Sequence, residues 1–400
     1  MPVSRRSFVA TLGAGATGLI GAPLLSWRGH EALLAQQQQP QLAAAEPHAD
    51  RLLASMPGMV RLDSNENPNG PGQRALAAIA QHFGDANRYP VKQTDDLIAE
   101  IARVQGVKPE NILLGCGSGE LLRTAVQTFT SRDKALVAPD PTFESPGNFA
   151  KFLATPVRAP KVDSVLKLDL NTTADAAKGA GLVYYCNPNN PTSTVHGAND
   201  TKMFVDQVLR SSPDTTILID EAYHEYVADP SYTTMIPLAV SNPRVIVTRT
   251  FSKVFGMAGL RAGYAIGTPE TLKRMQPWML GSNLNQLAIA AAMTTIGDKA
   301  HIAADVKQNA AARDFTRKFF EGQGYKIHST DANFLMVDIH RDSKAFKMEV
   351  AKHKVAIGRQ FPTLPTYTRI SIGTMPEMKK AVVAFEKVLA APAATSQQHH

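Results

Sequence analysis

Cysteine is nearly absent from this sequence, which holds two among its 400 residues. Two cysteines cannot form a disulfide framework, and no cluster of cysteine and histidine has the spacing of a zinc site, so we expect no metal ligands. Charged residues are also scarce at 19 %, whereas hydrophobic residues make up 44 %. This balance excludes a disordered chain and a highly charged coiled coil, and the length is sufficient for one large or two medium domains.

The sequence contains no block of Lys and Arg, although its net charge is +7. Three of the positive charges and one negative charge lie within the first 35 residues, and the others are spread along the chain. A modest excess without clustering is typical of a solvated surface. We therefore expect a soluble, enzyme-sized protein without a nucleic-acid partner.

The amino terminus has the pattern of a twin-arginine export signal. Arg5 and Arg6 precede an uncharged run at residues 9–26, which contains four glycines. This run is too weakly hydrophobic for a stable membrane span and has the flanks of a removable signal, with cleavage expected near Ala35 or at residues 43–45. An uncleaved amphipathic anchor is the alternative. We expect the twin-arginine machinery to export the folded protein to the periplasm or beyond, and a cofactor to be bound before export.

Composition divides the chain into six segments. A glutamine-rich, low-complexity linker follows the signal, and the last residues are rich in Ala, Ser, Gln and His. The expected segments are a signal peptide at 1–35, a linker at 36–50, an N-terminal arm with part of the small domain at 51–91, a large ligand-binding domain at 92–277, a C-terminal small domain at 278–389 and a flexible tail at 390–400.

Between these ends, apolar β-branched runs alternate with helical periodicity. Expected strands lie at residues 111–115, 135–138, 181–185, 215–220, 245–250 and 263–267, and expected helices include 94–104, 120–129 and 198–210. Continuous apolar strands separated by helices indicate a mostly parallel sheet covered by helices on both faces. After Pro277, residues 333–339, 355–358 and 369–372 predict a smaller antiparallel unit with helices. The expected fold class is therefore α/β, with a large domain and a smaller α+β domain.

A glycine-containing turn follows the first of these strands. The strand ends at Gly115, and Cys116-Gly117-Ser118-Gly119 leads directly into the helix expected from Glu120. Free N–H groups at a helix amino terminus, together with the positive end of the helix dipole, form a cradle suited to a phosphate. An ordinary tight turn is the alternative, because such turns are common.

Two further strands end in polar residues, at the edge where open parallel sheets bind ligands. The segment from Asn187 to Thr192 contains two Asn-Pro pairs, which hold the backbone extended or turned and leave side-chain amides free. Asp220 ends an apolar strand, so desolvation penalises its charge unless a cation is near. Capping of a helix is the alternative role for Asp220.

A lysine follows the next strand. Lys253 is flanked by Thr250, Ser252 and Arg261. A desolvated lysine close to an arginine has a lowered pKa, and its neutral amine is available as a nucleophile. On position alone a surface lysine is the alternative, but the neighbouring hydroxyls and arginine argue against it. A phosphate cradle, a buried carboxylate and a nucleophilic lysine at successive strand ends together match what pyridoxal 5′-phosphate requires.

The ordered motifs resemble those of class I/II aminotransferases, which are fold-type I pyridoxal-phosphate enzymes, and in particular the histidinol-phosphate aminotransferase branch. The resemblance covers roughly residues 63–389. Its motifs are Asn65-Glu66-Asn67-Pro68, Arg88-Tyr89-Pro90, Asn187 to Thr192, Asp220-Glu221-Ala222-Tyr223, Thr250 to Gly263, and Arg369-Ile370-Ser371-Ile372-Gly373. It implies transfer of an amino group between an amino acid, or a related amine, and a 2-oxo acid.

The resemblance also implies roles for individual residues. Lys253 forms the Schiff base and moves a proton, Asp220 pairs with the pyridinium nitrogen, and Tyr223 contacts the ring oxygen O3′. Arg369 is expected to bind the substrate carboxylate as a bidentate fork, with Asn190 contacting both O3′ and the substrate. The other expected cofactor contacts are Ser118, Gly119, Thr250, Ser252 and Arg261 around the phosphate, Phe143 stacked on the ring, and Tyr89 from the partner subunit of a homodimer.

Two positions depart from the histidinol-phosphate pattern. That branch usually has a tyrosine that helps to bind the substrate phosphate where this chain has Asn69, and an acidic residue in the phosphate loop where this chain has Gly119. The missing phenol weakens the case for a phosphorylated substrate, and so does the expected export, because histidine biosynthesis is cytoplasmic. We therefore expect another amino donor, whose side chain the sequence does not identify.

Two other functions remain open from the sequence. The same scaffold supports decarboxylation, β-elimination and aldol cleavage, and one relative of this branch decarboxylates a phosphorylated amino acid. Arg369 and Lys253 together favour loss of the Cα proton, and hence transamination. An exported binding protein without turnover is the alternative from another class, and the intact Lys253, Asp220, Tyr223 and Arg369 argue against it.

The cysteines and the histidines near the motifs carry no further expected chemistry. Cys116 and Cys186 both lie at strand ends and could pair in an oxidising compartment, but two unpaired buried thiols are expected. His82, His196 and His224 have no partner pattern for metal or triad chemistry. We interpret them as ordinary polar residues.

Overall fold

The computed structural model describes residues 56–391. The expected signal peptide at 1–35, the linker at 36–50 and the tail from 392 onward lie outside the described residues. Within 56–391, no helix combines the length and hydrophobicity needed to cross a membrane.

The largest sheet has seven strands in the order β2-β8-β7-β6-β5-β3-β4. These strands are β2 (Ile112–Gly115), β3 (Leu136–Val137), β4 (Val157–Arg158), β5 (Leu182–Cys186), β6 (Thr216–Asp220), β7 (Val245–Thr250) and β8 (Gly263–Ile266). Strand β8 runs antiparallel to its neighbours β2 and β7, and the other pairs are parallel. The predicted α/β class with a mostly parallel sheet is confirmed.

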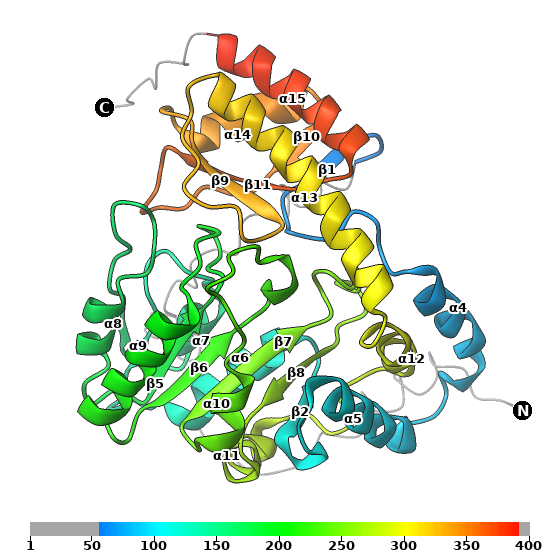
Figure 1. Cartoon of the computed structure of the whole chain (residues 1–400), viewed down its shortest axis with the longest axis vertical. Coiled ribbons are helices and arrows are strands. Elements are labelled where there is room, and N and C mark those ends of the chain that lie inside the picture. Colours follow the sequence, from blue (N-terminus) through cyan, green and yellow to red (C-terminus); the bar gives the residue numbers. More distant parts are fainter. Residues whose placement is uncertain (1–55, 392–400) are drawn as a thin grey trace, which may run out of the picture. The chain divides into compact units, whose positions relative to one another are not determined.

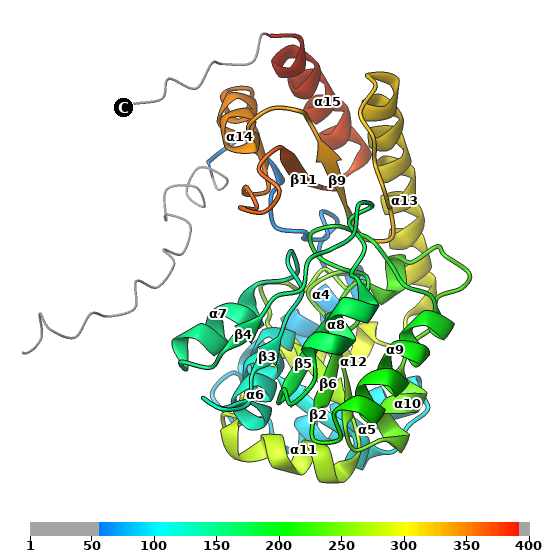
Figure 2. The same ribbon diagram turned by 90° about the vertical axis from the view of Figure 1, so that its left-hand side faces the viewer.

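Both faces of the central part of this sheet are buried, because every residue of β5, β6, β7 and β8 is buried. The edge strand β4 is partly exposed. Successive side chains point to opposite faces, so Val183 and Ile217 join one hydrophobic cluster and Leu182 and Leu218 join another. Figures 1 and 2 show helices around the sheet. They are α4 (Gln73–Gln81), α5 (Val91–Gln105), α6 (Ser118–Phe129), α7 (Ser145–Phe152), α8 (Leu170–Ala176), α9 (Ala198–Ser211), α10 (Ile236–Ser241), α11 (Pro269–Met275) and α12 (Gln286–Thr295), with short 3₁₀ turns η1 (Phe83–Asp85), η2 (Pro109–Asn111), η3 (His224–Tyr226) and η4 (Gln276–Trp278).

A second group of elements surrounds a separate hydrophobic cluster that includes Leu62, Phe320, Leu335 and Phe385. Its elements are β1 (Val60–Leu62), α13 (Lys299–Gly322), β9 (Phe334–Asp338), α14 (Ser343–Lys352), β10 (Val355–Ile357), β11 (Tyr367–Ser371) and α15 (Met375–Ala390). Strands β9 and β11 pair antiparallel, as predicted. The expectation that residues 355–358 join an antiparallel unit is wrong, because β10 pairs in parallel with β1 from the N-terminal arm.

Candidate active site

The carboxyl ends of three central strands meet at one edge of the sheet. Cys186 at the end of β5 is paired with Asp220 at the end of β6, and Asp220 is paired with Thr248 of β7. The segments that follow these strands carry Asn190, Tyr223 and Lys253, so the topology brings the predicted residues to the same edge.

Asp220 is a buried carboxylate held by two hydroxyl groups. The hydroxyl of Tyr184 donates to it over 2.9 Å, and the hydroxyl of Thr248 donates over 3.2 Å. Burial raises the pKa of Asp220 to about 6, while the two hydrogen bonds oppose that shift. Sequence reasoning missed Tyr184 and Thr248, because both lie inside apolar strands and only the pairing of those strands places them next to Asp220.

Lys253 is partly buried among groups that favour its neutral form. Its Nζ donates to the carbonyl oxygen of Asn65 over 3.1 Å and lies 5.5 Å from the centroid of the Tyr223 ring. Desolvation, together with the positive charge of Arg369, lowers the pKa of Lys253 to about 8. Arg261, the neighbour named from the sequence, contributes to the same shift but less than Arg369 does.

Asn65 hydrogen-bonds several residues of the site. From the sequence, no role was assigned to the motif that contains it. Its side-chain amide donates to the hydroxyl of Tyr223 over 3.2 Å, and its Oδ1 accepts from the hydroxyl of Ser371 over 2.8 Å. Its carbonyl oxygen accepts from Asn333 as well as from Lys253. The residue adopts φ +53°, a left-handed conformation that asparagine tolerates better than most residues. This turn therefore joins the lysine to β11 and to the residue that precedes β9.

Arg369 lies on β11 and is 9 % exposed. Its two Nη atoms donate to Oδ1 of Asn190 over 2.7 Å and to the carbonyl oxygen of Asp63 over 2.8 Å. Among the described residues its buried Nε has no hydrogen-bond partner. A buried N–H of a cation that lacks an acceptor is costly, and a carboxylate ligand would satisfy it. The structure thus places Asn190 against Arg369.

The glycine turn forms a cradle with Arg261. Gly117 caps α6 with φ +69°, and a side chain there would collide with the Arg261 guanidinium. Gly119 faces open space, with no protein atom within 4 Å of the position that a methyl group would take. Helix α6 begins at Ser118, two residues earlier than predicted, so the N–H groups of Ser118 and Gly119 belong to its first turn. A positive helix end beside a guanidinium fits an anion the size of a phosphate.

The other predicted phosphate residues lie beside this cradle. The guanidinium of Arg261 donates to the hydroxyl of Ser252 over 3.2 Å, and the Thr250 hydroxyl accepts from the backbone N–H of Ser252 over 3.1 Å. Arg261 has φ +61°, an uncommon conformation for a side-chain-bearing residue, which occurs at sites where the surrounding structure enforces it. These contacts support a phosphate position between α6 and the segment after β7.

The two predicted aromatic residues are more exposed than the rest of the site. Phe143 is 37 % exposed, and its neighbour Thr142 donates to Oδ1 of Asn189 over 2.7 Å. Tyr89 is 81 % exposed, and no hydrogen bond, ion pair or ring contact between described residues connects its side chain to Lys253 or Arg261. Within one chain, therefore, the structure does not bring Tyr89 into the site.

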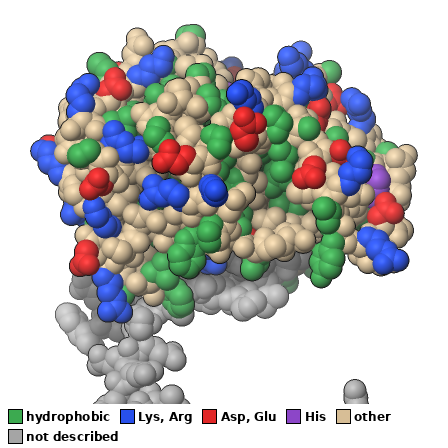
Figure 3. Space-filling model, turned by 90° about the horizontal axis from the view of Figure 1, so that it is seen from below, with side chains coloured by type: hydrophobic (Ala, Val, Ile, Leu, Met, Phe, Trp, Pro, Cys, Tyr) green, Lys and Arg blue, Asp and Glu red, His purple; other side chains and the backbone are tan. Residues whose placement is uncertain are grey.

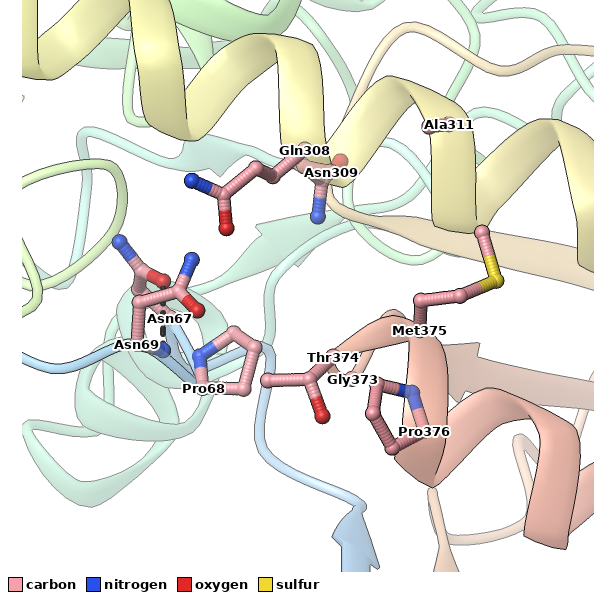
Figure 4. A pocket seen from close by; sticks show the side chains of 10 residues that line it. All are labelled: Asn67, Pro68, Asn69, Gln308, Asn309, Ala311, Gly373, Thr374, Met375 and Pro376. Carbon is pink, nitrogen blue, oxygen red and sulfur yellow. Dashed lines mark hydrogen bonds between the residues drawn. The ribbon is translucent and has the colours of Figure 1, made fainter.

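The arm residues after Asn65 line a cavity of about 250 Å³ (Figure 4). Asn67 donates to the carbonyl oxygen of Val254 and to Asp305 of α13, both over 2.8 Å, and Asn69 donates to the same carboxylate over 3.1 Å. The cavity is lined by Asn67, Pro68, Asn69, Gln308, Asn309, Ala311, Gly373, Thr374, Met375 and Pro376. The Asn69 amide is thus engaged with α13.

The cysteines and histidines of the described part of the chain show no metal arrangement. Cys116 is half-buried and Cys186 is buried, and both are free thiols. No group of three or more His, Cys, Asp or Glu side chains among residues 56–391 could hold a metal ion. Burial lowers the pKa of His196 to about 4 and that of His224 to about 3, and each imidazole hydrogen-bonds a protein oxygen, as does His82.

Known proteins resemble this chain over most of its length. The family described as aminotransferase class I and II matches residues 57–385. Histidinol-phosphate aminotransferase of Moorella thermoacetica is 33 % identical over 336 residues, covering 83 % of this chain and 86 % of the relative. Aromatic amino acid aminotransferase of Mycobacteroides abscessus is 34 % identical over 322 residues, covering 80 % of this chain and 90 % of the relative.

A solved structure agrees with these sequence relatives. Histidinol-phosphate aminotransferase from Sinorhizobium meliloti, in complex with pyridoxal-5′-phosphate, matches with a TM-score of 0.80 and 25 % identity, covering 88 % of this chain and 98 % of that chain. The chain belongs to the class I and II aminotransferase family. It is a pyridoxal-phosphate-dependent aminotransferase with histidinol-phosphate aminotransferases among its relatives, which confirms the activity and the cofactor expected from the sequence.

Proposed function

We propose that the enzyme moves the amino group of an amino acid to a 2-oxo acid, with Lys253 holding the cofactor and Arg369 holding the substrate carboxylate. The observation that carries this proposal is that both side chains donate hydrogen bonds to the backbone of the turn at Asn65. Lys253 donates to the Asn65 carbonyl oxygen, and Arg369 donates to the carbonyl oxygen of Asp63 two residues earlier. An amine of lowered pKa and a guanidinium with a free N–H therefore lie at the same turn.

The residues around this turn fit pyridoxal phosphate. The first turn of α6, the hydroxyls of Thr250 and Ser252, and Arg261 would hold its phosphate. When bound, the cofactor supplies an electron sink for the bonding electrons released at the substrate Cα. Asp220 is largely ionised at neutral pH with a pKa of about 6, so its carboxylate would hold a proton on the ring nitrogen.

Lys253 is suited to proton transfer at Cα. With a pKa of about 8, a useful fraction of its amine is neutral near pH 7.5, while most of it is protonated and available as an acid. Tyr223 lies beside the lysine, with its hydroxyl held by Asn65. Arg369 fixes the carboxylate end of the substrate, so the Cα proton is presented to the lysine in one orientation.

We propose that the amino donor is not histidinol phosphate. Asn69 stands where that branch usually has a phosphate-binding tyrosine, and its amide is hydrogen-bonded to Asp305. We further propose export by the twin-arginine route, which rests on Arg5, Arg6 and the weakly hydrophobic run after them.

We propose a homodimer in which Tyr89 reaches the phosphate of the partner subunit's cofactor. Its support is the unusual exposure of apolar side chains along the chain before and after the sheet. Phe83 is 62 % exposed, Val91 68 %, Trp278 51 % and Leu280 74 %. Figure 3 shows exposed hydrophobic side chains among scattered charges on the face seen from below. A second copy of the chain would bury such a surface.

A donor screen tests the proposed function. Purified enzyme with pyridoxal phosphate would receive one amino donor at a time, histidinol phosphate included, together with pyruvate or 2-oxoglutarate. Mass spectrometry would then quantify the new alanine or glutamate. We expect product from at least one neutral amino acid, and none with the Lys253→Ala variant. Product with the variant, or none from any donor with the wild type, would contradict the proposal.

A further inference from the structure

An ion pair joins two loops at the edge of the site. Glu144 follows the predicted stacking residue Phe143 in the loop before α7, and Arg359 follows Gly358 in the loop after β10. Oε1 of Glu144 contacts Nη2 of Arg359, and the two side chains are 39 % and 25 % exposed. A second contact joins the same loops, because the hydroxyl of Thr363 donates to Asp140 over 3.1 Å. These two contacts therefore hold together two loops that are far apart in the sequence.

Arg359 belongs to the same electrostatic environment as the carboxylate-binding Arg369. Both guanidinium groups lie against the buried ring of Phe361, with Cζ of Arg359 4.3 Å and Cζ of Arg369 5.7 Å from its centroid. Desolvation lowers the pKa of Arg369, the charge of Arg359 lowers it further, and the charge of Glu144 raises it. The guanidinium of Arg369 therefore lies within the electrostatic influence of both members of the ion pair.

The charges of these three residues select against a second anionic group on the substrate. The α-carboxylate of an amino acid would bind Arg369, whose Nε–H has no hydrogen-bond partner among the described residues. A side-chain carboxylate or phosphate could pair with Arg359, but Glu144 already contacts that guanidinium and would repel the incoming anion. An ion pair of this exposure stabilises the fold little.

We propose that Glu144 is a specificity-determining residue, which neutralises Arg359 and thereby favours substrates with an uncharged side chain over dicarboxylic and phosphorylated ones. This inference rests on the proposed function, because it assumes that Arg369 binds the α-carboxylate. It identifies the substrate class as amino acids with neutral side chains and their 2-oxo acids. It also predicts that the site can be converted to accept a second anion by removing one charge.

The test measures binding of two unreactive acids to the enzyme loaded with pyridoxal phosphate. Glutarate carries two carboxylates and pentanoate carries one on a chain of the same length. Glu144→Gln should bind glutarate about tenfold more tightly than the wild type does, because a freed guanidinium gains a charge-assisted contact. Pentanoate affinity should change less than twofold. Calorimetric titration supplies both dissociation constants without requiring turnover.

Two further variants complete the test. In the Glu144→Gln background, Arg359→Gln should remove the gain for glutarate. Glu321→Gln removes a carboxylate of 41 % exposure that pairs with Arg317 on α13, and should leave both affinities unchanged. Unchanged glutarate affinity in Glu144→Gln, or a gain that survives Arg359→Gln, would overturn the proposal. Absence of amino transfer by the wild type would instead overturn the proposed function, while the binding comparison still decides the role of Glu144.

Discussion

Lys253 owes its proposed chemistry to the groups that surround it. An ammonium at this position loses hydration and faces the positive charge of Arg369, while Glu66 and Asp220 offset only part of the penalty. Asp220 is in the opposite situation, because burial penalises its negative charge and two hydroxyls offset part of that penalty. Both residues therefore titrate closer to neutrality than ordinary side chains of their type.

The first prediction concerns the pH at which the amine of Lys253 reacts. In cofactor-free enzyme, acylation of this side chain should rise with pH through a midpoint of about 8, because only the neutral amine is a nucleophile. Peptide mass spectrometry after brief exposure to an acylating reagent across pH 6 to 11 (roughly the titration range of amines) measures it. Arg369→Met should move the midpoint upward by removing a nearby positive charge. A wild-type midpoint above about 10 would contradict a lowered pKa.

The second prediction concerns Asp220 and the stability of cofactor-free enzyme. Its folded-state pKa of about 6 is raised above the ordinary value of 3.8, so its stabilising contribution is present at low pH and is lost as pH rises through 6. Between pH 4 and pH 7 the ionisation of this group alone should lower the unfolding free energy by about 2 kcal/mol. Over that range the unfolding free energy of the wild type, measured in urea, should therefore fall relative to that of Asp220→Asn. A pH-independent difference would show that burial does not raise this pKa.

At the scale of secondary-structure elements, α6 is suited to the proposed phosphate cradle because its amino terminus is built from glycine and serine. Gly117 must adopt φ +69° and must leave room for Arg261, whereas Gly119 faces open space. Gly263 at the start of β8 serves the same turn, because a side chain there would collide with the backbone of Ser118. Gly117 and Gly263 are thus required by close approach of neighbouring atoms.

The third prediction compares two glycines of this turn. Gly117→Ala should weaken pyridoxal phosphate binding by at least about tenfold, because the new methyl group displaces Arg261 and strains the backbone. Gly119→Ala is the matched control, since its methyl group meets no protein atom and the backbone N–H remains. Absorbance titration of cofactor-free protein gives both affinities. Equal losses in the two variants would contradict the cradle as described.

At the scale of the whole molecule, the site draws on elements far apart in the sequence. The turn at Asn65 lies beside Lys253, Asn333 and Ser371, and the strand before it completes a sheet with β10. Tyr89 remains outside the site of its own chain, so its proposed role depends on a second subunit.

The fourth prediction tests that shared site by mixing inactive variants. Tyr89→Ala and Lys253→Ala should each lose activity in isolation. After unfolding and refolding together in equal amounts, half of the dimers are mixed, and each holds one site with both residues intact, which is about one quarter of all sites. Activity should return in proportion. No recovery in refolded dimers would place Tyr89 outside the partner's site, and the two variants refolded separately are the control.

The sequence alone could predict those features that depend on a local pattern of residues. Continuous apolar strands predicted the sheet, and a polar residue after such a strand predicted Asp220 and Lys253. The sequence could not predict contacts between distant segments, such as those of Tyr184 with Asp220 and of Glu144 with Arg359. The pairing of β1 with β10 was also missed, because strands of three residues carry too little periodicity to be recognised.

The most direct test of amino transfer through Lys253 follows the atoms of one labelled donor. The best neutral amino acid from the donor screen would carry ¹⁵N, deuterium at Cα and ¹³C in its carboxylate, with pyruvate as acceptor. We expect ¹⁵N-alanine, together with a 2-oxo acid that retains ¹³C and has lost the Cα deuterium. Release of ¹³CO₂, or alanine without ¹⁵N, would contradict amino transfer through a lysine that removes the Cα proton.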